Sequence, residues 1–198
     1  IKLLEDNTYE VRLTVLKQLL SSLTAKDSPT QSAQVLPPHV DIERLQIVLL
    51  SHLGVHIDSE KFRQPFVETH AKAIAFILQL LNRMECALPR SLLHHTLRNA
   101  LTNTMGAQSG DVWSVLWNAY TSKMSTSTVR FESLAFMGFL VRQLCVETNS
   151  LCRLSKETLD WLPADVNELL HALITNIVLK WLKLCKKGSQ PHIVRFLL

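Results

Sequence analysis

The sequence predicts an all-α protein, a segment of an α-solenoid with about eight or nine helices. Gly and Pro are few, at 5 and 7 of 198 residues, which disfavours the many tight turns of a β-sandwich. Leu-rich runs place apolar residues every three or four positions, the period of a helix, and no alternating strand pattern of useful length occurs. A polar turn followed by Val-Arg also occurs twice, at Val11-Arg12 and Val129-Arg130.

The two copies of this phrase agree beyond the dipeptide. In each, a leucine follows the arginine four positions later, Leu16 and Leu134. We interpret the phrase as a tight link between antiparallel helices, in which polar residues cap the second helix, the valine packs and the arginine reaches along the stack. The valines lie 118 positions apart (129 − 11), or three intervals of about 39, close to the period of 40–47 residues of HEAT and Armadillo units. The arrangement resembles the second helix of a HEAT repeat.

The first half of the chain is expected to hold three helices, over 8–23, 40–53 and 59–84. Asn7 and Glu10 have the spacing of a capping box at the first, and Gly54 ends the second. Residues 24–38, rich in Ser, Thr, Gln and Pro, predict a flexible loop between helices.

The second half is expected to hold helices starting at Pro89 and over 111–122, 129–147, 156–161 and 163–187, the last closed by Gly188. Apolar positions recur on one side of these helices. From this periodicity we predict a core that contains Leu16, Leu20, Leu49, Ile77, Leu97, Leu134, Ile174 and Ile177.

Composition bounds the class of protein. With 47% hydrophobic and 19% charged residues, the chain is not intrinsically disordered. No signal peptide is present, and the apolar window 166–184 carries Asn, Glu, His and Lys, so we expect no membrane insertion. Four cysteines without a CxxC pattern indicate reduced thiols, hence the cytosol, with the nucleus as a second location. Neither end has a polar capping unit, so residues 1–198 are expected to be an internal segment of a longer α-solenoid.

No motif predicts catalysis. His52 and His56 are four apart, but Gly54 lies between them and only Asp58 is a nearby third ligand, so surface or core histidines are expected instead of zinc. Ser109 lacks the GxSxG frame of a hydrolase. We therefore predict a protein that is not an enzyme, with no metal and no cofactor.

The C-terminal charges are the feature that bears on binding. Lys180, Lys183, Lys186, Lys187 and Arg195 form a basic run with no Asp or Glu after Ile177. Cations at a helix C-terminus complement the helix dipole, which is one interpretation. The other is a patch for RNA phosphates or an acidic partner.

Two tryptophans are a second feature of the sequence that bears on binding. Trp113 and Trp117 are four apart, on a different side of their helix from its aliphatic residues. We expect both to be buried in the stack, since a helix that is apolar all round is normally enclosed. Exposure of the pair would instead indicate a groove for a partner.

The residues 5–16, Glu-Asp-Asn-Thr-Tyr-Glu-Val-Arg-Leu-Thr-Val-Leu, resemble segments of the thyroid adenoma-associated protein family, very large Armadillo/HEAT-type proteins. The Ser/Pro loop and the phrase from Val129 to Leu134 are compatible with its C-terminal half. The resemblance implies a scaffold partner of a tRNA 2′-O-ribose methyltransferase that helps place the anticodon loop, with tRNA as a further partner. The alternative is a HEAT-type protein–protein adaptor, in trafficking, transport or complex assembly, without RNA binding.

Overall fold

The computed structural model describes residues 1–24, 41–57, 67–104, 110–153, 159–163 and 165–187. Within these ranges all regular structure is helical and no residue lies in a strand, so the all-α prediction is confirmed. The elements are η1 (Lys2–Glu5), α1 (Tyr9–Thr24), α2 (Ile42–His52), α3 (Ala71–Met84), α4 (Arg90–Leu101), α5 (Val112–Thr121), α6 (Ser127–Leu151), α7 (Val166–Leu173), η3 (Ile174–Val178) and α8 (Leu179–Lys187).

The described residues form seven helices longer than a single turn, fewer than the eight or nine expected. The π-helical turn η3 joins α7 and α8 into one continuous rod, so these count as one helix. The helix expected from residue 59 has its described start at Ala71, after an extended stretch 67–70, while 58–66 lie outside the described residues. Of the helix expected over 156–161, residues 159–161 are not helical, and 156–158 lie outside the described ranges. The expected loop also falls outside them, apart from Thr24, which ends α1.

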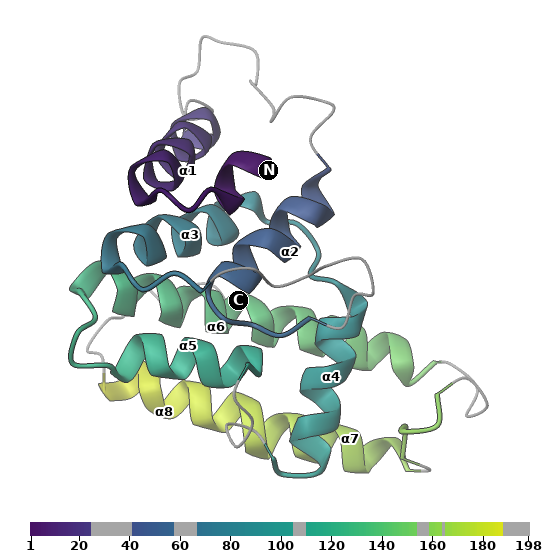
Figure 1. Ribbon diagram of the computed structural model, residues 1–198. Helices are drawn as coiled ribbons and strands as arrows, with labels where there is room; N and C mark the ends of the chain where they lie inside the picture. Colours follow the sequence, from purple (N-terminus) through teal and green to yellow (C-terminus); the bar gives the residue numbers. More distant parts are fainter. Residues whose placement is uncertain (25–40, 58–66, 105–109, 154–158, 164, 188–198) are drawn as a thin grey trace, which may run out of the picture.

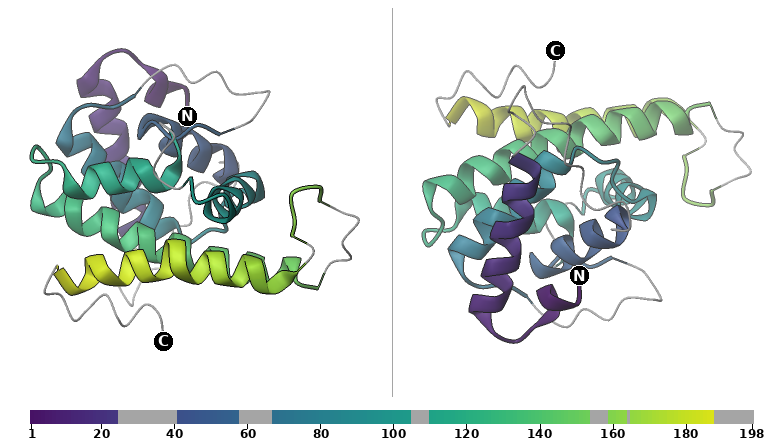
Figure 2. Two further views of the ribbon diagram at one scale, coloured as in Figure 1. Left: turned by 90° about the horizontal axis from the view of Figure 1, so that it is seen from below. Right: turned by 90° about the horizontal axis from the view of Figure 1, so that it is seen from above.

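Helices α1, α3 and α6 pack on one another in that order and form the backbone of the fold (Figure 1). α2 packs on α3, α5 lies along α6, and the rod of α7, η3 and α8 packs on the other side of α6, with α4 against α7 (Figures 1 and 2). The two Val-Arg phrases open α1 and α6. Only α3 separates these two helices in the stack, so 118 residues cover two steps of about 59 (118/2) instead of three of about 39.

Side-chain caps fix where several helices begin. Asp41, Asp111, Thr126 and Asp165 each accept a hydrogen bond from a backbone N–H in the first turn of α2, α5, α6 and α7. Such caps satisfy N–H groups that have no partner within the helix. At these four helices, the polar residue that precedes the apolar run therefore sets the observed start.

The predicted core is confirmed at six of eight positions, with Leu16, Leu49, Ile77, Leu97, Leu134 and Ile177 buried. Leu20 is only half-buried on α1, and Ile174 is 50% exposed. The prediction is wrong for Ile174, whereas Leu20 packs against the core without being fully buried.

The exposure of Ile174 follows from the spacing of the buried residues on the rod. Leu169, Leu173, Ile177 and Trp181 are all buried, and they follow one another every four residues. In an ideal α-helix each four-residue step overshoots a turn by about 40°, so three steps would rotate the buried line by about 120°. The wider π turn absorbs this rotation and leaves Ile174 facing outward.

The rod packs on α6 through a tryptophan and a glycine. Trp181 is 1% exposed, and its Nε1–H donates to the Leu134 carbonyl oxygen at 3.2 Å. A Cβ at Gly138 would lie 2.8 Å from the Trp181 ring, so only glycine allows this approach. The missing side chain in the middle of α6 thus positions α8.

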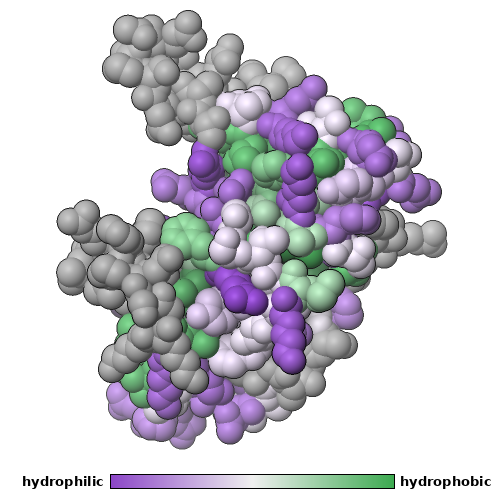
Figure 3. Space-filling model, turned by 90° about the vertical axis from the view of Figure 1, so that its left-hand side faces the viewer, coloured by the Kyte–Doolittle hydropathy of each residue, from purple (hydrophilic) through white to green (hydrophobic). Residues whose placement is uncertain are grey.

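The surface is mixed in character. The face at the left of Figure 1 shows small apolar groups between polar side chains over its described residues (Figure 3). None of the described helices is both long enough and apolar enough to cross a membrane.

Candidate functional site

The structure places only part of the predicted basic run. Lys180 and Lys183 lie on α8, the first half-buried and the second exposed, and neither forms an ion pair within the described part of the chain. The side chains of Lys186, Lys187 and Arg195 fall outside the described residues. The predicted patch therefore rests on two described lysines.

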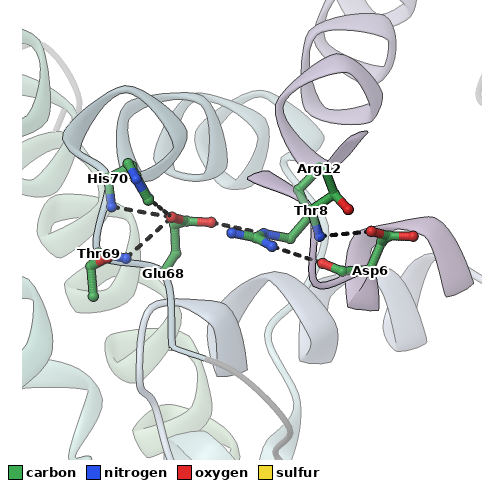
Figure 4. A network of polar contacts seen from close by, with 6 residues as sticks. All are labelled: Asp6, Thr8, Arg12, Glu68, Thr69 and His70. Carbon is green, nitrogen blue, oxygen red and sulfur yellow. Dashed lines mark hydrogen bonds and ion pairs between the residues drawn. The ribbon is translucent and has the colours of Figure 1, made fainter. Parts of the chain in front are cut away.

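Arg12, the arginine of the first Val-Arg phrase, is buried at the junction of α1 and α3 (Figure 4). Its Nε donates to Glu68 Oε2 at 3.0 Å, and its Nη1 donates to the Asp6 carbonyl oxygen at 2.7 Å. The predicted reach of this arginine along the stack is confirmed, since Glu68 precedes the next stacked helix. Because it is buried and ion-paired, Arg12 does not contribute to a phosphate-binding surface.

Glu68 has a second task at the start of α3. Its Oε1 accepts hydrogen bonds from the backbone N–H groups of Thr69 and His70, at 3.2 and 3.1 Å, and lies 2.9 Å from His70 Nδ1 (Figure 4). Burial alone would raise the pKa of Glu68, but the hydrogen bonds from His70 and Arg12 outweigh it and the pKa is lowered. Tyr9 stacks on His70 with ring centroids 4.0 Å apart. The network joins two helices and is a structural joint.

His52 and His56, the pair weighed above as zinc ligands, do not share a helix. His52 is buried in α2, and burial lowers its pKa, whereas His56 lies beyond the helix end and is exposed. Asp58 is outside the described residues. No group of three or more His, Cys, Asp or Glu in the described ranges has the geometry to hold a metal ion.

A second polar cluster ties α4 to α6. His94 Nε2 lies 2.8 Å from Glu147 Oε1, and the Arg98 guanidinium lies 5.6 Å from the centroid of Trp161. The His94 and Trp161 rings also contact each other in a tilted arrangement, with 5.5 Å between their centroids and 56° between their planes. These contacts hold Trp161, which lies between α6 and α7 in the sequence, against α4.

The two tryptophans of α5 have different environments. Trp113 is buried, as expected, whereas Trp117 is 38% exposed, so the expectation is wrong for the second ring. The two do not form an exposed pair. They therefore do not provide the groove that such a pair would indicate.

A groove of about 480 Å³ lies where the end of α1, the end of α3 and the first half of α6 meet. It is lined by Leu23, Asn82, Arg83, Glu85, Phe131, Glu132, Ala135, Gly138, Phe139 and Arg142. Phe131 is 42% exposed, an uncommon state for a phenylalanine, and the Arg142 guanidinium lies 5.4 Å from the Phe139 ring centroid. We call this the α3–α6 groove.

Contacts within the groove hold its walls in place. Asn82 Nδ2 donates both to the Glu132 carbonyl oxygen at 3.0 Å and to its carboxylate at 2.7 Å, which ties α3 to α6. The formal charges of the lining residues balance, with Arg83 and Arg142 against Glu85 and Glu132. The groove therefore offers an apolar anchor point and charges of both signs.

Sequence reasoning missed this groove because its residues come from three helices. One signal was present on α6, where Phe131, Ala135, Gly138 and Arg142 recur at steps of four, three and four and so share a face. The position of α3 leaves this face of α6 open as one wall of the groove.

Comparisons with known proteins complete the description of the site. No protein-family model matches the chain, and neither curated proteins nor solved structures give a significant match. The features of the molecule that bear on its function are the α3–α6 groove and the two described lysines of α8.

Proposed function

We propose that this chain is a non-catalytic helical scaffold that binds a protein partner in the α3–α6 groove. The observation that carries the proposal is the groove itself, with Phe131 exposed between arginines and glutamates on a firmly joined helix stack. Rigid helices present such side chains at fixed spacing, which lowers the entropy cost of binding. As part of the same proposal, the helix stack of this chain is a segment of a longer α-solenoid.

The charge balance of the groove favours a protein over a nucleic acid as its occupant. A phosphate backbone is bound by an excess of Lys and Arg, whereas two glutamates here offset the two arginines. An amphipathic helix laid in a groove makes apolar contacts along one face and polar contacts at its edges. Phe131 and Phe139 suit the first kind of contact, and Arg83 and Arg142 suit the second.

The resemblance of residues 5–16 to the thyroid adenoma-associated family supplies a specific partner for this proposal. The partner is the catalytic subunit of a tRNA 2′-O-ribose methyltransferase, which the scaffold helps to place on the anticodon loop. The adaptor alternative predicts a different protein in the same groove.

Titration of the purified methyltransferase subunit against the chain tests the partner. Phe131→Ala and Arg142→Glu should each weaken binding about tenfold or more, because central aromatic and arginine contacts dominate interface energies. Val146→Ala is the matched control, an exposed apolar residue of α6 that does not line the groove. Equal affinities for all four proteins would refute docking in this groove.

RNA binding by α8 is the second candidate function, supported by exposed Lys183 and by the absence of Asp and Glu from the rest of α8. The triple variant Lys180→Glu, Lys183→Glu and Lys187→Glu should weaken tRNA binding uniformly across sequences. The log–log salt slope should flatten by roughly 0.7–0.9 per lost phosphate contact. An unchanged affinity and slope would leave only the helix-dipole role for these lysines.

A further inference from the structure

We draw no further inference here: the strongest candidate, the largely apolar pocket of about 300 Å³ between α3, α5 and the start of α6, is lined by no charged residue in the described part of the chain, and nothing in the structure shows what would occupy it.

Discussion

The two copies of the Val-Arg phrase open helices of the same stack, yet their arginines have opposite environments. Arg12 is buried between α1 and α3 and pairs with Glu68 at 3.0 Å. Arg130 is exposed at the start of α6 and donates to the Ser122 carbonyl oxygen at 3.2 Å. Both arginines bind a carbonyl oxygen of the turn before their helix, since Arg12 donates to that of Asp6. The two arginines have different environments because the neighbouring element of the stack presents different residues to each helix.

Glu68 precedes α3 and reaches the first arginine, whereas the neighbour of α6 on its far side is the rod, which contributes Trp181. The first junction is therefore polar and the second is apolar. A local phrase specifies a capped turn and an arginine that satisfies it. The next helix in the stack decides whether that arginine is buried.

The largest expected difference between the junctions comes from removing each arginine. Arg12→Met should cost about 3–5 kcal/mol of unfolding free energy, because it leaves Glu68 buried without its cation. Arg130→Met should stay within about 0.5 kcal/mol, as is usual for exposed changes. Urea unfolding of the two variants provides the measurement.

A double variant sharpens this test. Arg12→Met combined with Glu68→Leu removes both charges and should recover part of the loss, since an apolar pair often replaces a buried ion pair at little cost. Equal losses for Arg12→Met and Arg130→Met would show that the two junctions do not differ as described.

Overpacking should destabilise the apolar junction between α6 and the rod. Gly138→Ala places a Cβ 2.8 Å from the Trp181 ring, so we expect a loss of about 1–3 kcal/mol, although alanine is the better helix former. Trp181→Phe added to Gly138→Ala should show strong non-additivity, because the smaller ring leaves room for the methyl group. A Gly138→Ala protein as stable as the unmodified chain, by thermal melting, would contradict this account.

Sequence patterns predicted the helical class, several boundaries and most of the tested core, because these follow from period and capping. Ile174 was misplaced because the four-residue spacing of Leu169, Leu173 and Ile177 only becomes meaningful once the π turn is seen. The partner of Arg12 could not be predicted, because Glu68 is 56 positions away in sequence. The α3–α6 groove depends on where α3 ends over α6, which no single helix encodes.

Acid should weaken the polar junction in two steps. Burial lowers the pKa of His52 from 6.5, so the native state resists protonation and stability falls as pH drops below about 6.5. The pKa of Glu68 is lowered from 4.5, so its contribution is complete above that value and is lost as pH falls through the lowered native pKa.

The difference in unfolding free energy between the unmodified chain and Glu68→Gln isolates the second step. Because the Glu68 charge also raises the pKa of His52, the difference should be constant only above about pH 6.5, and the loss of the Glu68 contribution should appear as a decrease below pH 4.5. Asp6, whose pKa is lowered by the Thr8 backbone hydrogen bond, titrates in the same window in both proteins and cancels from the difference. A difference that stays constant down to the acid transition would show that Glu68 is not held in its charged form.

The smallest effect is expected at the cap of α6. Thr126 accepts a hydrogen bond from the Val129 N–H at 3.2 Å, so Thr126→Ala should cost about 1 kcal/mol. A hydroxyl does not titrate in this range, and the loss should therefore be the same at pH 7 and pH 4. Thr126→Ser, which keeps the acceptor, should retain most of the stability. The Glu68 carboxylate accepts hydrogen bonds from the backbone N–H groups just before α3, so a pH-independent loss at Thr126 beside a pH-dependent one at Glu68 would establish that the two stacked helices are joined at their starts by chemically different contacts.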